Sequence, residues 1–342
     1  MPTSVDLHAP DADSLGEPQP RPAPAHVVAA AVCAAAGAGS PATLALVLET
    51  DGSTYAGAGA MALFGPGTTQ LCWLSGGCLE PEIARCAGEV AASGRIGWME
   101  IDTRDDAALL SGSALGCRGR LRLALLPVAQ LPGVQAPLQA WLDGDGDMRW
   151  SIGQDGRIAL GAGAQAQAQA WRLDAAAPGW MSVETWTLSS AARPQLLLCG
   201  GGPETPMLLP LLRDLGWRTT LVEARARWQS LAALADMHRA DGVAAALVDG
   251  PSYDAALVMH HNCELDLDAL DALSATQVPF VGLLGPRRRC EDLFRLLTSA
   301  PHAALRARLH SPVGLDLGGR GAEAIALSIA AQLQAWRHGR RP

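Results

Sequence analysis

The apolar and polar positions in the first half of the chain predict a mixture of helices and short strands. Residues 26–38 form an apolar, alanine-rich run that predicts a helix, and the apolar segment 43–49 predicts a strand. Residues 60–64 and 70–74 flank a Gly-Pro-Gly turn and predict a hairpin. This order is typical of an α+β domain.

A second helix is predicted directly after the double glycine at residues 76–77. Its apolar stripe recurs at helical spacing and is made by Leu79, Ile83, Cys86 and Val90. Strands are then expected at 97–102 and 120–128. Residues 130–190 carry a weaker pattern, from which we expect one helix at 134–142 followed by meander strands.

From Pro194 the pattern changes to apolar segments that alternate with helical ones, which is typical of a parallel sheet covered by helices on both faces. Strands are expected at 195–199, 219–223, 244–248, 254–259 and 279–284. The fold class is therefore α/β: an N-terminal mixed α+β domain and a C-terminal Rossmann-like domain. We place a disordered tail at 1–24, the first domain at 25–190 and the second at 194–338.

Composition narrows the class of protein. The chain has 342 residues, 49% of them hydrophobic, and a mean hydropathy of +0.13. No apolar run reaches the roughly 20 residues that cross a bilayer, and the Pro-rich, acidic start does not resemble a secretory signal. We expect a folded cytoplasmic protein that does not bind membranes.

Charge and cysteine content exclude several kinds of site. The net charge of -8 gives no nucleic-acid footprint, and the eight cysteines form no CxxC pair that would indicate structural zinc. All 26 basic residues are arginine. A P-loop lysine, a Schiff base and a lysine general base are therefore excluded.

The stretch SGGCLEPE, residues 75–82, is the first candidate site. Gly76 and Gly77 join a strand to the start of a helix, where backbone N–H groups and the positive end of the helix dipole favour a thiolate at Cys78. The negative charges of Glu80 and Glu82 nearby disfavour that thiolate. The structural alternative is a tight turn in which Cys78 merely packs.

The second domain carries a partial dinucleotide fingerprint. Gly200 and Gly202 follow a strand, and Glu223 stands where the ribose carboxylate of such sites belongs. Thr205 replaces the third small residue, and Pro210 falls inside the predicted helix. The pattern predicts Rossmann topology, whereas NAD(P) binding and an oxidoreductase activity stay open as the alternative function.

Two further polar clusters follow strands of this domain. Residues 260–263 read His-His-Asn-Cys and lie at the carboxyl edge where α/β sheets bind ligands. Arg287, Arg288 and Arg289 open a helix and favour an anionic partner. Each cluster could equally be an ordered loop or a solvated face.

Together, seven segments resemble the XdhC/CoxI family, in the same order, over roughly residues 28 to 336. They are VLETDGSTYAGAGAMALF, LSGGCLEPEI, LGCRG, LLLCGGGPET, the loop at 260–266, FVGLLGPRRR and LHSPVGLDLGG. The resemblance implies an accessory protein, a homodimer, that binds molybdenum cofactor and delivers it to an apo-enzyme of the xanthine dehydrogenase type. Sulfuration of the cofactor, with a cysteine desulfurase as partner, is implied as well.

The same resemblance singles out residues for this role. Cys78 matches the family's GGCLE motif as a candidate molybdenum ligand, with Gly76, Gly77 and Glu80 beside it. Cys117 matches a second motif, although Arg118 stands where the family has glycine. In the second domain Gly200, Gly202, Glu223 and His261 fall in family motifs, and His261 matches the first family histidine. A scaffold that joins desulfurase to target without touching the cofactor is the competing interpretation.

Overall fold

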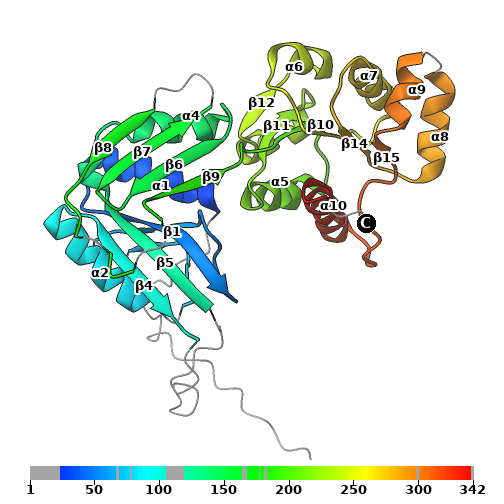
Figure 1. The fold of residues 1–342 in the computed structure, drawn as a ribbon. Helices are drawn as coiled ribbons and strands as arrows, with labels where there is room; N and C mark the ends of the chain where they lie inside the picture. The colour runs from blue at the N-terminus through cyan, green and yellow to red at the C-terminus, as the bar shows by residue number, and fades with distance from the viewer. Residues whose placement is uncertain are drawn as a thin grey trace, which may run out of the picture. The chain divides into compact units, whose positions relative to one another are not determined.

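The computed structural model describes residues 24–66, 69–77, 79–104, 119–163, 168–176, 178–180, 183–297 and 300–339. Three of the predicted site residues, Cys78, Cys117 and Arg118, lie outside these ranges, as do residues 1–23 of the predicted tail. The described residues form two compact units (Figure 1). Ala140–Gly146 and the residues from Ala191 onward belong to the second unit, and the others belong to the first.

The first unit is built on a five-stranded sheet in the order β3-β2-β1-β5-β4, with every pairing antiparallel. Its elements in chain order are α1 (Ala25–Ala38), β1 (Thr43–Gly52), β2 (Met61–Phe64), β3 (Gln70–Leu71), α2 (Glu80–Ser93), β4 (Gly97–Asp102), β5 (Gly119–Pro127), η1 (Val128–Gln130) and the first part of α4 (Gln135–Asp143). The last residues of α4, from Ala140, belong to the second unit. The predicted hairpin is present as the β2–β3 pair. The helix predicted after the double glycine is α2.

Helix α2 covers one face of this sheet. Ile83, Ala87 and Val90 are buried on it and pack with the alternate, inward residues of β5, among them Leu123 and Leu125. The spacing of the buried positions on α2 is the helical one, and that on β5 is two, so each element presents one apolar face. The apolar stripe of α2 therefore packs against the apolar face of the sheet.

A smaller antiparallel sheet completes the first unit, in the order β8-β7-β6-β9. Its strands are β6 (Met148–Gly153), β7 (Arg157–Ala162), β8 (Gln169–Arg172) and β9 (Thr185–Ser190). They are the predicted meander strands. Burial alternates strictly along β9 and most of β7, so one face is apolar and the other faces solvent.

The second unit is a six-stranded sheet in the order β12-β11-β10-β13-β14-β15, with every pairing parallel. Its elements are β10 (Gln195–Cys199), α5 (Thr205–Asp214), β11 (Arg218–Val222), η2 (Ala226–Leu234), β12 (Met237–Arg239), α6 (Val243–Asp249), β13 (Ala255–Val258), α7 (Cys263–Ser274), β14 (Phe280–Leu283), α8 (Arg287–Leu296), α9 (Ala300–Arg306), β15 (Leu309–His310) and α10 (Ala322–Arg337). This order confirms the Rossmann-like prediction.

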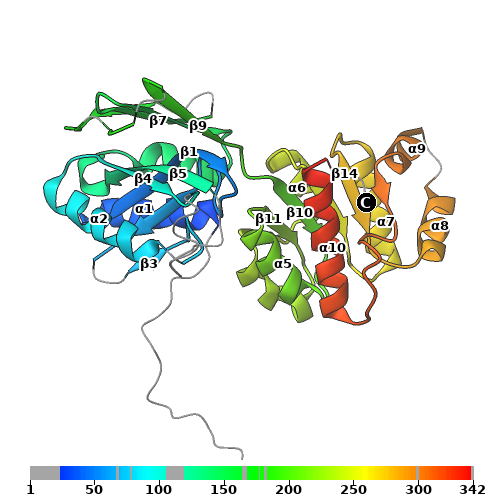
Figure 2. The same ribbon diagram turned by 60° about the horizontal axis from the view of Figure 1, so that its bottom comes forward.

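Helices cover both faces of this sheet, as Figure 2 shows for α5 and α10 on one side. Alternate residues of the central strand divide between two cores: Leu196 and Leu198 pack with α5 and α10, whereas Leu197 and Cys199 pack with α6, α7 and α8. A strand buried on both faces is apolar throughout, which explains the continuous run in the sequence. Helix α5 continues through Pro210.

One predicted strand is wrong. Residues 244–248 belong to helix α6, and the third strand of the sheet is β12 instead. Val243 and Ala246 are the buried residues of α6, a helical spacing, and the alanines between them are strong helix formers.

Among the described residues, none of the helices has both the length and the apolar character of a membrane span.

Candidate functional site

The corner that precedes α2 is organised by Glu80. Its side chain is 3% exposed and accepts hydrogen bonds from the backbone N–H groups of Leu74, Ser75 and Gly77 at 2.9, 2.7 and 2.8 Å. The Ser75 hydroxyl donates to the same carboxylate and accepts from the N–H of Leu79. Glu80 therefore holds the whole turn from residue 74 to the start of the helix.

This carboxylate is an internal anion. Burial raises its pKa, but the hydrogen bonds from Ser75 and Leu74 outweigh burial and leave the pKa below its ordinary value. From the sequence we expected the backbone N–H groups of this corner to point at a bound ligand. In the structure three of them are directed at Glu80, so Glu80 positions the turn and leaves those donors already used.

The two glycines of the corner are required by both conformation and space. Gly76 and Gly77 have φ values of 77° and 105°, which disfavour any side chain. A Cβ atom would lie 3.2 Å from the ring of Tyr55 at Gly76, and 3.2 Å from the ring of Trp73 at Gly77. Two aromatic side chains therefore lie against the turn that leads to Cys78 in the sequence.

The start of β5 lies against the loop at 53–55, which also contacts this turn. A Cβ atom on Gly119 would clash with the carbonyl oxygen of Ser53 and would lie 2.6 Å from the Thr54 methyl group. Tyr55, the next residue, packs on Gly76. The loop at 53–55 thus contacts both the turn before residue 78 and the strand that begins after residue 118.

In the second unit the predicted residues meet at one edge of the sheet. The strand order reverses between β10 and β13, and the loops that follow these two strands carry the glycine turn and the histidine pair. Gly200 has φ 91°, and a Cβ there would lie 2.6 Å from the His260 ring. This crevice at the strand reversal is where open α/β sheets bind ligands.

Glu223 lies at this edge with its acceptor positions occupied. It is 2% exposed and accepts from the N–H of Gly201 at 2.7 Å and from the N–H of Arg225 at 2.8 Å. The Arg225 guanidinium adds two more bonds, at 2.6 and 2.8 Å. Burial raises the pKa of Glu223, but these bonds lower it by more, so the net shift is downward. A ribose would have to displace one of these donors, since a carboxylate offers about four acceptor positions.

Arg225 joins three strand ends. Besides Glu223, it donates to the carbonyl oxygen of His260 at 2.7 Å and to that of Gly201 at 3.0 Å. The guanidinium fork is suited to such a role because its donors are fixed in one plane. Sequence reasoning missed this residue, although the spacing Glu-Ala-Arg directly after a strand was visible.

A second carboxylate lies over the glycine turn. A Cβ on Gly202 would be 2.8 Å from Oε2 of Glu204 and 2.9 Å from Nε2 of His261, and these two side chains are 3.2 Å apart. The N–H of Gly202 donates to the Thr205 hydroxyl at 3.0 Å. In a dinucleotide site the pyrophosphate approaches this glycine closely; here a carboxylate stands in that place.

His260 is held by a buried acid. Asp266 is 1% exposed, accepts from Nδ1 of His260 at 3.1 Å and pairs with Arg289 at 2.6 Å. Burial raises the pKa of Asp266, but the bonds from His260 and Arg289 lower it below its ordinary value. Arg288, in contrast, is largely exposed to solvent. Asp266 was not predicted, because its relation to His260 depends on how the loop turns into α7.

Two protein-family models match this chain. The model of the XdhC and CoxI family matches residues 35–102, and the model of the XdhC Rossmann domain matches residues 196–333. This chain belongs to the XdhC/CoxI family.

A relative from Bacillus subtilis, named a probable xanthine dehydrogenase subunit, is 28% identical over 148 residues, which are 41% of this chain. The match spans 42% of that relative's own length. A crystal structure described as a xanthine dehydrogenase from Bacillus halodurans has a TM-score of 0.75 and 24% identity, and the match covers 92% of this chain and 96% of that one. At this identity the likeness shows the fold.

The XdhC Rossmann unit contains a cavity of about 320 Å³ beside the Arg225 clamp. It is lined by the ends of β11 and β13 and by residues of the β12–α6 connection and α7. The polar residues at its wall are Glu223, Arg225, Asp241, His260 and Asp268. No group of three or more His, Cys, Asp or Glu side chains within the described ranges is arranged to hold a metal ion.

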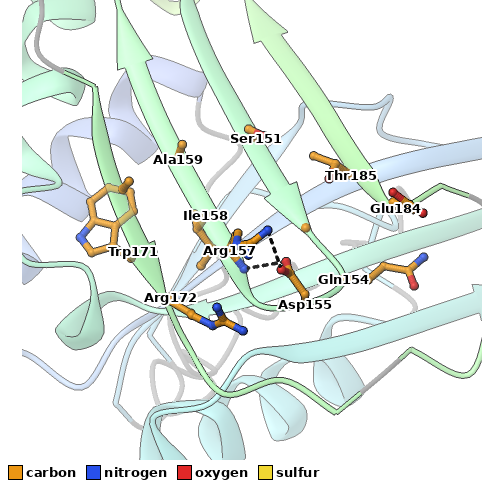
Figure 3. Close-up of a pocket in the computed structure, with 12 residues that line it drawn as sticks. Ser151, Gln154, Asp155, Arg157, Ile158, Ala159, Trp171, Arg172, Glu184 and Thr185 are labelled. Carbon is orange, nitrogen blue, oxygen red and sulfur yellow. Dashed lines mark hydrogen bonds and ion pairs between the residues drawn. The ribbon is translucent and has the colours of Figure 1, made fainter.

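The first unit has a wider hollow on the solvent face of its small sheet, shown in Figure 3. Its floor consists of small side chains such as Ser151 and Ala159, and its rim carries the Asp155–Arg157 ion pair at 3.3 Å. Within the described ranges, none of the predicted site residues lines it. Those that the structure describes lie at the corner before α2 or at the edge of the parallel sheet.

Proposed function

We propose that this chain is an accessory protein in the maturation of a xanthine dehydrogenase-type molybdenum enzyme. Its cargo is molybdenum cofactor, which it binds, holds during sulfuration and delivers to the apo-enzyme. Membership of the XdhC/CoxI family and the name of the Bacillus subtilis relative support the accessory role. A cytoplasmic location, a cysteine desulfurase partner and a homodimeric state belong to the same proposal.

The observation that carries the proposal is the corner fixed by Glu80. A buried carboxylate with four donors holds residues 74–77 in place immediately before Cys78 in the sequence. Thiolates are ligands that soft metal centres accept. We propose Cys78 as the molybdenum ligand. Since Glu80 uses the amides of the turn, we assign the phosphate of the cargo to Arg118 and its neighbours.

We also propose that Cys117 belongs to the same site as Cys78. The support is the loop at 53–55, which contacts the turn at Gly76 through Tyr55 and contacts Gly119 through Ser53. Both cysteines are within two residues of these contacts along the chain. Soft sulfur donors from two loops would shelter a labile cargo better than a single one.

Anaerobic co-purification tests the carrier function. Protein produced in a host that makes the cofactor should contain stoichiometric molybdenum and pterin, and Cys78→Ala should lose most of both. Cys86→Ala is the matched control, because Cys86 is a half-buried cysteine farther along α2. Equal molybdenum in the Cys78 variant would remove the thiol from the mechanism, and none in the wild type would remove the carrier role.

The alternative function, an NAD(P)-dependent oxidoreductase, finds little support in the geometry of the second unit. Glu223 and Glu204 place two carboxylates where a dinucleotide needs a free ribose acceptor and a pyrophosphate site. Titration with NAD(P)H, followed by tryptophan fluorescence, decides the question. Saturable binding accompanied by turnover would favour the enzyme.

A further inference from the structure

The cavity beside the Arg225 clamp has a buried histidine whose second ring nitrogen is unused. His260 is 7% exposed and lines the cavity, and its Nδ1 is bonded to Asp266. Within the described ranges, Nε2 of His260 makes no hydrogen bond, and it is not among the sealed atoms that lack partners. This nitrogen is therefore not fully buried, and the residue that carries it lines the cavity.

The chemistry of that nitrogen follows from its partner. Oδ1 of Asp266 accepts both from the His260 backbone N–H and from Nδ1, and Oδ2 accepts from Arg289. A carboxylate that is an acceptor fixes the proton of a neutral imidazole on Nδ1. Nε2 then presents a lone pair.

The charges at the wall select the ligand further. Three carboxylates line the cavity, from Glu223, Asp241 and Asp268, against the single guanidinium of Arg225. Glu223 forms an ion pair with Arg225, and Asp241 forms one with Arg239. Asp268, in contrast, is exposed and has no ion pair with the described residues. The side-chain atoms that this described wall leaves for a ligand are thus acceptors, and an anion is disfavoured.

The volume of the cavity limits the size of the ligand. A volume of about 320 Å³ is at the small end of ligand sites, enough for one heterocycle or nucleoside and too small for a dinucleotide. The rest of the wall is apolar, with Val222, Val243 and Leu265 as its larger side chains. A flat ring fits such a wall, and its N–H groups would meet the acceptors.

We propose that this cavity binds an uncharged planar heterocycle with adjacent ring N–H and amino donors, the edge shared by guanine and pterin. His260 Nε2 and the Asp268 carboxylate are its polar contacts. The carboxylates of the wall, with Glu204 over the neighbouring glycine turn, disfavour phosphorylated forms. The site belongs to the Rossmann unit alone. It does not rest on cofactor handling by the first unit, because its ligand binds without molybdenum.

Isothermal titration of the full chain tests this site with guanosine, unsubstituted pterin, adenosine and guanosine monophosphate as probes. Guanosine or pterin should bind at least about tenfold more tightly than guanosine monophosphate, and more tightly than adenosine, which lacks the ring N–H. Binding of guanosine alone identifies a purine ligand, and binding of pterin alone identifies a pterin. Equal affinity for the phosphorylated form, or no binding by any probe, overturns the proposal.

Variants separate the site from folding. Asp268→Asn removes an exposed carboxylate and should weaken binding about tenfold without changing the melting temperature. His260→Ala should weaken it by at least as much. Asp214→Asn and His338→Ala are matched controls, since both residues are exposed and lie outside the cavity. Unchanged affinity in Asp268→Asn would exclude the assigned contact.

Discussion

Each unit has a buried carboxylate at its glycine turn, but the hydrogen-bond donors that hold this carboxylate differ between the two units. In the first unit the buried carboxylate of Glu80 is held by backbone N–H groups and a hydroxyl, with no cation among the described residues. In the second unit the buried carboxylate of Glu223 is held by one backbone N–H of the turn and by Arg225. Both turns look in sequence like anion sites, and both have filled that site internally.

The difference shows which groups each unit leaves for a ligand. In the first unit, a carboxylate satisfied by amides and a hydroxyl fixes the path of the backbone through residues 74–77. A carboxylate paired with an arginine that also bonds Gly201 and His260 closes the crevice instead. The second unit is left with the His260 nitrogen beside that clamp. Ligand binding thus depends on the partners of each acid rather than on the glycines.

The largest effect is expected from breaking the clamp. Arg225→Met leaves Glu223 almost fully buried with a charge and no cation, which should lower the free energy of unfolding by about 3 kcal/mol or more. Adding Glu223→Gln in the same chain should recover most of the loss, because the buried charge is gone. Urea unfolding of the single and double variants measures both. No recovery in the double variant would mean that Arg225 acts through its other bonds.

A smaller effect is expected at the first corner. Glu80→Gln keeps one acceptor oxygen but turns an NH2 donor toward the N–H groups of the turn, at a cost of about 2 kcal/mol at neutral pH. The folded pKa of Glu80 is lowered, so its carboxylate stabilises the fold above its unfolded pKa. The gap between wild type and variant should therefore shrink as the pH falls below about 4.3. A gap that is independent of pH would show that charge plays no part.

The smallest effect is expected from Glu204→Gln. It removes the charge above Gly202 while preserving the shape of the side chain and a partner for His261. Stability should change little, whereas affinity for guanosine monophosphate should rise by up to about tenfold relative to guanosine. Titration with both ligands checks this. An unchanged ratio would show that phosphate is rejected for another reason.

Sequence reasoning predicted elements that are set by periodicity. The stripe on α2 and the apolar runs of β10, β13 and β14 follow from burial on one or two faces, and the parallel sheet followed from their alternation. It failed at residues 244–248, where a short alanine-rich run fits a strand and a helix equally well. The contacts that decide the site were beyond its reach. Asp266 meets His260 and Arg289 only after two loops and two helices have been placed. From the sequence, Glu80 was expected beside the ligand, whereas it supports the turn.

We have proposed that Cys78, which follows the Glu80 corner in the sequence, ligates the molybdenum of a bound cofactor. Molybdenum K-edge X-ray absorption on the anaerobically loaded protein examines that bond directly. We expect one more sulfur neighbour at the metal in the wild type than in any residual loaded Cys78→Ala protein. Identical sulfur shells in the wild type and the Cys78→Ala protein would show that Cys78 does not ligate the metal.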